Sequence, residues 1–195
     1  MGSGDYHLQA GSPCINMGSN AAPRLPATDY DEDPRIIDGT VDMGLDETHP
    51  SVQPDLWIKK GTQWIGDNLY NDDGTGQTVT LTVAPGTAGL YQGRLYNDGN
   101  QTATFWIKGP SGDEDWTVRY YTGTEVDPLK EVTAKVTSAR GWRHLNVPSG
   151  ASRRFCFTVT SNSGVTRGRF ETLIRAEAQR DSTQRDTLRS VTILE

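Results

Sequence analysis

Hydrophobic and polar residues alternate along the chain from residue 55 onward. In the stretch 77–84, QTVTLTVA, Val79, Leu81 and Val83 alternate with threonines. Because successive side chains of a strand point to opposite faces, this pattern predicts a strand with one buried and one hydrated face. Similar stretches predict six more strands, over 89–97, 103–108, 115–121, 153–160, 170–178 and 187–195.

The same periodicity assigns a direction to individual side chains. Trp106 and Cys156 are expected to point away from the core, opposite to their neighbours in the sequence. The residues expected to point inward are Phe105, Ile107, Trp116, Val118, Tyr120, Phe155, Phe157 and Val159.

Turn-forming residues separate these stretches. Gly, Pro, Asn, Asp and Ser gather in segments such as NDDGTG, APGT, NDGN and VPSG. The chain contains 21 Gly and 10 Pro, and only 34% of its 195 residues are hydrophobic, which is typical of a turn-rich β protein. We therefore expect an all-β fold: an Ig-like antiparallel β-sandwich over residues 51–195.

Residues 1–50 differ from the rest of the chain. They show no sustained periodicity, and 49–56 (HPSVQPDL) is interpreted as a linker because two prolines disfavour helix before them. Residues 1–54 carry nine acidic side chains against Arg24 and Arg35, a net charge of −7, whereas the whole chain carries −6. The contrast predicts two units, 1–50 and 51–195.

Charge and hydropathy restrict the partners. No basic patch stands out to meet phosphates, and the arginines of 167–189 are interleaved with acids, so we expect no nucleic-acid binding. No stretch approaches the about 20 apolar residues of a transmembrane helix, so we expect no membrane insertion.

The start, MGSGDYHLQAGS, lacks the charged and apolar regions of a signal peptide and resembles a tag remnant. We interpret the chain as a piece of a longer protein.

The two cysteines, Cys14 and Cys156, lie far apart in the sequence and in different predicted units. No CxxC or Cys/His cluster exists, which argues against a structural zinc site. The cysteines either form a disulfide that joins the two units or remain thiols in a mostly buried setting.

Carboxylates concentrate in 28–47, TDYDEDPRIIDGTVDMGLDE. Asp29, Asp31 and Asp33 have the spacing that begins an EF-hand loop, and calcium prefers such clustered oxygen ligands. The pattern then fails, because Pro34 and Thr40 stand where Gly and a bidentate Glu are needed.

A different type of calcium site in this stretch is one hypothesis. The alternative is that these carboxylates cap turns or pair with Arg35. Catalysis is disfavoured, because nothing rigid in this loop would hold two acids across a cleft.

Aromatic residues suggest a second kind of site. Trp57, Trp64 and Trp106 are candidates for stacking against sugar rings, since Trp106 is expected to face outward. The alternative is that these rings fill the core or cover its flank.

Residues 5–47 resemble the end of a known family of bacterial surface proteins. The segments DYHLQAGSPCINMGSN, TDYDEDPR and DGTVDMGLDE are similar to the tail of choice-of-anchor Q, pectate-lyase-like parallel β-helix proteins. The chain departs from that pattern at Glu32–Asp33, where Gly is common, and at Cys14. The resemblance implies that this segment is a β-helix C-terminal cap, and that the active groove would lie in rungs absent from this chain.

Residues 53–195 resemble bacterial extracellular Ig-like modules of the CARDB kind. The resemblance rests on the turns Pro85–Gly86, Asn97–Asn100 and Pro148–Gly150. Gly and Asn at such turns tolerate positive φ and close hairpins. Because sandwiches host many activities, this signature says more about fold than about function.

These observations predict a non-catalytic module of a secreted or cell-surface bacterial protein, with a structural, adhesion or assembly role. The histidines His7, His49 and His144 lie in unrelated settings and no nucleophile motif is present, so we expect no enzyme. Partners would be other domains of the same polypeptide, neighbouring copies or a glycan. The alternative is a carbohydrate-binding module that serves a secreted polysaccharide-active enzyme.

Overall fold

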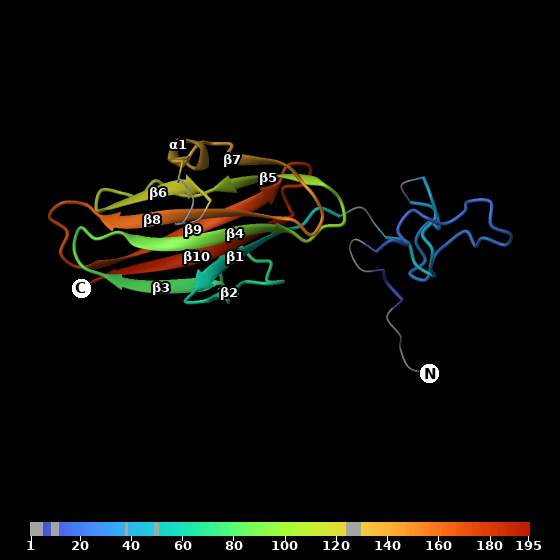
Figure 1. The fold of residues 1–195 in the computed structure, drawn as a ribbon, viewed down its shortest axis with the longest axis horizontal. Coiled ribbons are helices and arrows are strands. Elements are labelled where there is room, and N and C mark those ends of the chain that lie inside the picture. Colours follow the sequence, from blue (N-terminus) through green and yellow to red (C-terminus); the bar gives the residue numbers. More distant parts are fainter. Residues whose placement is uncertain (1–5, 9–11, 38, 49–50, 124–129) are drawn as a thin grey trace.

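The computed structural model describes residues 6–8, 12–37, 39–48, 51–123 and 130–195. Two five-stranded sheets pack face to face and form a β-sandwich (Figure 1). The first sheet has the order β2-β1-β4-β8-β6 and the second β3-β10-β9-β5-β7. The elements are β1 (Pro54–Lys60), β2 (Gln63–Ile65), β3 (Thr78–Val83), β4 (Gly89–Asn97), β5 (Ala103–Lys108), β6 (Trp116–Thr122), α1 (Thr133–Val136), β7 (Trp142–Val147), β8 (Ser152–Ser161), β9 (Gly168–Ala178) and β10 (Arg185–Leu194).

One strand pair departs from the expected antiparallel arrangement. β3 runs parallel to β10, with Thr78 opposite Arg189 and Val83 opposite Leu194, whereas the other pairs of named strands are antiparallel. The chain leaves β2 in the first sheet and crosses to the edge of the second before β4 returns to the first. This crossover gives β3 the direction of β10, and alternation alone does not reveal it.

The core lies between the two sheets and contains the side chains that were expected to point inward. Phe105, Ile107, Phe155 and Phe157 are all buried. Gly93 of β4 is required in this core because a Cβ there would lie 2.3 Å from the Phe155 ring. Aromatic packing therefore depends on a residue without a side chain at the centre of β4.

The expected strands are present with shifted ends, and others were missed. β1 begins at Pro54, inside the predicted linker, because proline is tolerated as the first residue of a strand. β2 and β7 were not predicted. Of the turn glycines in the second resemblance, Gly86 and Gly150 have positive φ. Gly99 is instead required by close approach, since a Cβ there would lie 2.4 Å from the Ser51 carbonyl oxygen.

Cys156 lies in β8 between the inward-facing Phe155 and Phe157, so its side chain points to the outer face, as expected. It is nevertheless fully buried. Cys14 is half-buried in the N-terminal segment, and no disulfide joins the two cysteines. The thiol interpretation agrees with the structure and the disulfide does not.

The edges of the sandwich are protected in different ways. Along β6, the chain segments around Ser111 and Lys130 occupy the outer backbone groups: the Val118 amide donates to the Ser111 carbonyl (3.0 Å) and the Thr122 amide to Lys130 (2.9 Å). Along β7, a register shift against β5 and a positive φ of 48° at Asn146 interrupt the edge. α1 contacts β6 and β7 and closes the side between them with buried Val136.

The described part of the N-terminal segment, 6–8, 12–37 and 39–48, consists of turns and bends with one bridge, Thr28 to Pro34. Arg35 organises it: its guanidinium pairs with the carboxylate of buried Glu47 and contacts the carbonyls of Asp42 and Gly44. This acid–base pair replaces the predicted pairing of Arg35 with Asp29 or Asp31.

Within the described ranges, no helix is long and apolar enough to cross a membrane.

Candidate functional site

The three candidate tryptophans lie on two different faces. Trp57 of β1 and Trp64 of β2 share the outer face of the first sheet, where Trp57 lies opposite Arg94 of β4. Trp106 of β5 lies on the outer face of the second sheet, opposite Arg143 of β7. The structure therefore brings two of the three together and separates the third.

On the first sheet the aromatic rings stack on protein groups. Trp57 lies 5.6 Å from Tyr96 between ring centroids, with an interplanar angle of 10°. The Arg94 guanidinium lies 5.4 Å from the Trp57 centroid and 4.3 Å from that of Trp64. Burial lowers the pKa of Arg94. The stack Trp64–Arg94–Trp57–Tyr96 uses ring faces that a sugar would need, so this face favours the structural alternative.

The buried carboxyl of Asp55 holds Trp57 in this stack. The Trp57 indole Nε1 donates to Asp55 Oδ2 (2.5 Å), and the Asn68 amide donates to the same oxygen (3.1 Å). Asp55 Oδ1 is buried without a hydrogen-bond partner among the described residues. Burial raises the pKa of Asp55 to about 7, although both hydrogen bonds oppose the shift. The repulsion from Asp98 and Asp186 adds to it.

Asp186 of β10 is the second buried carboxyl. It accepts hydrogen bonds from the Leu56 amide (2.6 Å), the Asn71 amide (3.2 Å) and the Gln77 side chain (2.6 Å). Burial raises the pKa of Asp186 to about 6, while these hydrogen bonds act in the other direction. Asp186 thereby connects β10 to β1 across the sandwich and fixes the loop before β3.

On the second sheet, Trp106 lines an open cleft of about 460 Å³. This volume lies within the range of small-molecule sites. The other lining residues come from α1, the turn after it, and β7: Ala134, Lys135, Ser138, Gly141, Trp142 and Arg143. Gly141 allows β7 to approach β5, since its φ is 90° and a Cβ there would lie 2.7 Å from the Ile107 carbonyl oxygen.

The cleft is basic. The Arg143 guanidinium lies over the Trp106 ring, 5.6 Å from its centroid, and 3.2 Å from the Gln179 side-chain oxygen, which holds it there. Lys135 of α1 is exposed and also lines the cleft, and none of the lining residues is acidic. Glu177 lies opposite Trp106 on β9, but Lys108 donates to its carboxylate (2.6 Å). We call this feature the Trp106 cleft.

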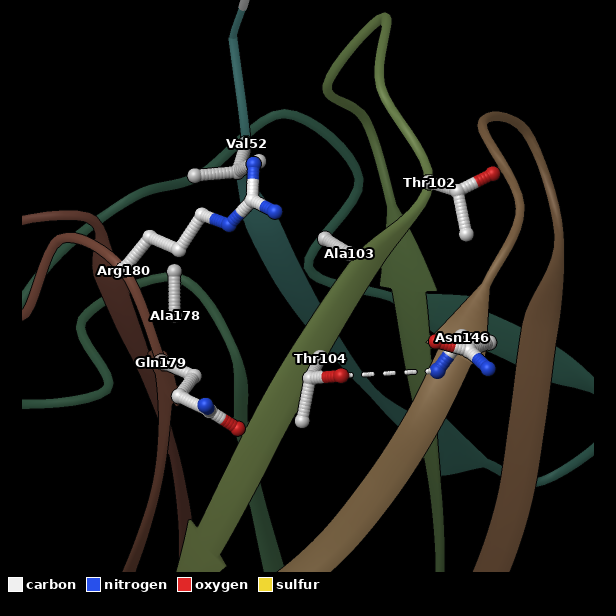
Figure 2. A pocket seen from close by; sticks show the side chains of 8 residues that line it. All are labelled: Val52, Thr102, Ala103, Thr104, Asn146, Ala178, Gln179 and Arg180. Atoms are coloured by element: carbon white, nitrogen blue, oxygen red, sulfur yellow. Dashed lines mark hydrogen bonds between the residues drawn. The ribbon is translucent and has the colours of Figure 1, made fainter.

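A smaller pocket lies at the end of the sandwich where the chain enters β1 (Figure 2). Its volume is about 140 Å³, below the usual range for ligand sites. Val52, Ala103 and Ala178 are among its lining residues, and the Asn146 amide contacts Thr104 Oγ1 at 3.5 Å. The pocket lies beside the register shift between β5 and β7, so we interpret it as a hollow that this irregular pairing leaves.

The carboxylates of 28–47 do not converge as the EF-hand spacing suggested. Asp29 Oδ1 accepts the amides of Asp31 (3.0 Å) and Asp33 (2.9 Å), and its Oδ2 accepts that of Glu47 (3.1 Å). Asp29 therefore has the turn-capping role that was the alternative to calcium. Within the described residues, a different group, His7, Asp31 and Asp46, brings possible ligand atoms within 4.8 Å of one another. Calcium binding in this loop stays a prediction.

The histidines lie apart in the structure. His7 Nε2 contacts exposed Asp31 (2.9 Å) in the N-terminal segment. His144 is buried in β7, 4.1 Å from Trp142 between ring centroids, and burial lowers its pKa to about 4. His49 lies outside the described residues.

Sequence reasoning missed the partners of the candidate aromatics, Arg94, Tyr96 and Arg143. Each is placed by strand register across 37 or more positions, as for Trp57 and Arg94. Alternation identified the outward direction of Trp106, and no local signal identified its neighbours.

No protein-family model and no curated protein matches the chain. Similar solved structures include the VesB protease of Vibrio cholerae, at 13% identity over 60% of this chain and 30% of that one, with a TM-score of 0.35. They also include the ASH/PapD-like domain 7 of human CEP192, at 15% identity, 83% and 96% coverage and a TM-score of 0.38. Domains 4 and 5 of the S-layer protein SbsC match at 13% identity, 80% and 59% coverage and a TM-score of 0.32. The chain spans less than a third of the protease. Similarity at this level carries no functional argument.

Proposed function

We propose that this chain is a non-catalytic module of a secreted or cell-surface protein that holds neighbouring domains in line. The chain enters the sandwich at one end, where the Asp98 amide donates to the Gln53 carbonyl (2.8 Å). It leaves at the other end, where the Glu195 amide donates to the Val83 carbonyl (3.2 Å) (Figure 1). β4, with 9 residues, spans the two ends. This corresponds to about 30 Å at ~3.3 Å per residue.

In this proposal, residues 5–47 are the cap of a β-helix and the sandwich is a CARDB-like Ig-like module. The first assignment rests on the sequence resemblance of residues 5–47, and the buried Arg35–Glu47 pair gives this loop-rich segment a fixed centre. The opposite positions of entry and exit support the second, because a spacer must separate the domain on its N-terminal side from the domain on its C-terminal side.

An assembly role has support at one edge. β3, TVTLTV, is an outer strand with no charged residue or proline, and Thr80 and Thr82 are exposed. Charged residues and prolines are the usual protection of an edge strand against pairing with another chain. β3 is thus the edge at which a neighbouring copy or domain would add a strand.

Spin labels test the spacer geometry. Labels on Ser51→Cys and Glu195→Cys, in a chain with Cys14→Ser and Cys156→Ala, should give one narrow distance distribution centred between about 30 and 40 Å. A centre below about 20 Å, or a broad distribution, would contradict a rigid spacer.

Light scattering at high concentration tests assembly. Association that Thr80→Lys abolishes supports an assembly role, and a monomer at all concentrations counts against it.

The second candidate function is carbohydrate binding at the Trp106 cleft. The observation that favours it is a half-buried Trp106 beside an open hollow of about 460 Å³, with Arg143 over its ring, whereas Trp57 carries both Arg94 and Tyr96. Glycan-array binding that is lost in Trp106→Ala and retained in Trp64→Ala would support this function. Loss in Trp64→Ala alone would move the site to the first sheet.

A further inference from the structure

The basic side chains around Trp106 continue along the outer face of the second sheet. Trp106 and Lys108 are two residues apart on β5, so they point to the same side. Lys108 lines a second hollow of about 290 Å³, together with Leu173, Arg175, Glu177 and Thr187. The two hollows share no lining residue, but they adjoin Trp106 and Lys108, which are neighbours on the same side of β5, and we call the two together the track.

Cations outnumber acids on this track. Lys135, Arg143, Lys108 and Arg175 line the two hollows, against Glu177 alone. Arg175 lies 3.6 Å from Asp72, but that carboxylate also pairs with Arg185 at 2.7 Å, so one acid is shared by two arginines. The track therefore retains positive charge after its internal ion pairs are formed.

A buried hydroxyl adds a polar group without a partner. Thr187 lines the second hollow and is 1% exposed. Its Oγ1 has no hydrogen-bond partner within the part of the chain that the structure describes. Buried polar groups normally have a partner. This oxygen is itself closed off from the surface, so a ligand hydroxyl would complete its hydrogen bonding only if the hollow opened further.

We infer that the track from Trp106 to Thr187 binds an acidic oligosaccharide, a chain of sugar rings that carry carboxylates. This rests on the proposed glycan-binding function and adds the charge class of the ligand. An indole with Arg143 over its ring and Lys135 in the same cleft suits a ring with an apolar face and an attached carboxylate. Arginine in particular can bind a carboxylate through two parallel hydrogen bonds. The ring favours a sugar over an acidic peptide. Trp142 also lines the cleft but packs against the core, so the cleft lacks the successive exposed platforms that single-stranded nucleic acid uses.

The experiment is calorimetric titration with hexamers of galacturonate, mannuronate and glucuronate-containing chains, each paired with its methyl ester. The ester keeps the sugar rings and removes the charge. We expect wild type to bind at least one acid hexamer about tenfold or more tightly than its ester at 50 mM NaCl, with affinity falling at 500 mM. Trp106→Ala should weaken binding about tenfold or more, and Lys135→Gln/Arg143→Gln should abolish the preference for the acid. Lys60→Gln/Arg167→Gln removes the same charge at exposed positions outside the track and should change little.

The outcomes separate the two levels of the proposal. Equal binding of acid and ester, still dependent on Trp106, overturns the acidic-ligand inference and leaves glycan binding intact. No binding to these hexamers or to a neutral glycan array overturns both. Tighter binding to poly-glutamate or to oligo-dT than to any uronate assigns the track to an acidic peptide or a nucleic acid instead. Thermal midpoints of all variants show whether a loss of binding reflects unfolding.

Discussion

The buried carboxyl of Asp55 should make the sandwich less stable at alkaline pH, and Asp55→Asn should remove this penalty. In the folded protein burial raises the pKa of Asp55 to about 7 from its ordinary value of 3.8. The folded state therefore holds a proton between about pH 4 and 7 that the unfolded state releases. Stability is greatest below the unfolded pKa and falls as pH rises through the folded one.

The size of the effect can be worked out from the shift. Raising the pKa of Asp55 from 3.8 to about 7 corresponds to about 4 kcal/mol, because each tenfold change in proton affinity is worth ~1.4 kcal/mol. This is an upper value, because local relaxation and water entry reduce the penalty of a buried charge. Asparagine keeps the oxygen that accepts from Trp57 and Asn68 and places an uncharged NH2 group where the oxygen has no partner, so the gain comes from removing the buried charge and not from a new hydrogen bond. We expect Asp55→Asn to be about 2–4 kcal/mol more stable than wild type at pH 8, with the difference shrinking to about 1 kcal/mol or less near pH 4.

The variant difference, rather than the wild-type curve, is the quantity to measure. Burial lowers the pKa of His144 to about 4, so the histidine makes the sandwich less stable as pH falls below about 6.5. This opposes the trend from Asp55, whereas Asp186, whose pKa burial raises to about 6, adds to that trend, so the wild-type profile sums three contributions. Subtracting wild type from Asp55→Asn cancels the histidine contribution.

The assay is urea unfolding from pH 4.5 to 8.5, monitored by circular dichroism, because Trp57 lies beside the mutated site and its fluorescence would change with the substitution. Equal m-values would show that both proteins expose the same surface on unfolding. Asp67→Asn removes an exposed carboxylate from the loop that covers Asp55 and controls for net charge. A variant difference that does not change with pH, or an Asp55→Asn protein less stable than wild type at pH 8, would refute the reasoning.

Four further predictions concern the core, the two outer faces and the N-terminal segment. Gly93→Ala should destabilise the sandwich by about 1–3 kcal/mol in urea unfolding, because its methyl group would overlap the Phe155 ring, and Phe155→Leu should partly rescue it. Trp57→Ala should lower the thermal midpoint more than Trp106→Ala, since Trp57 stacks on Tyr96 and holds Asp55; the reverse order would contradict the structural role of the stack. Glu47→Ala should expose the N-terminal segment to proteolysis and leave the sandwich midpoint unchanged, because it leaves the Arg35 charge buried without its acid. Asp29→Ala should increase cleavage of this segment equally in calcium and in EDTA if the carboxylate acts by capping, whereas protection by calcium that is lost in the variant would restore the calcium hypothesis.

Alternation predicted the inward faces of the sandwich well because each strand there buries one side against the opposite sheet. Phe105 and Ile107 are buried and Trp106 is not, as a period of two requires. β7 escaped prediction because WRHLNV alternates weakly and contains the Asn146 distortion. The direction of β3 depends on a crossover between sheets, which no window of sequence contains. Asp55 was assigned to the predicted linker, 49–56. Its burial could not be predicted locally, because it comes from the later loop around Asn68 that folds back over Asp55.

The contrast between the two outer faces connects the spacer proposal with the binding proposal. On the first sheet, Arg94 lies between two tryptophans and the aromatic surface is closed by the protein's own groups. On the second, Arg143 is held over the Trp106 ring by Gln179, and the adjoining cleft remains open. A module whose chain enters and leaves at opposite ends uses those ends for neighbouring domains and leaves its lateral faces accessible. A ligand track across β5, β7 and β9 is therefore compatible with an in-line spacer. The spacer role and the binding role can accordingly be tested separately, by distances between the ends and by substitutions on the second sheet.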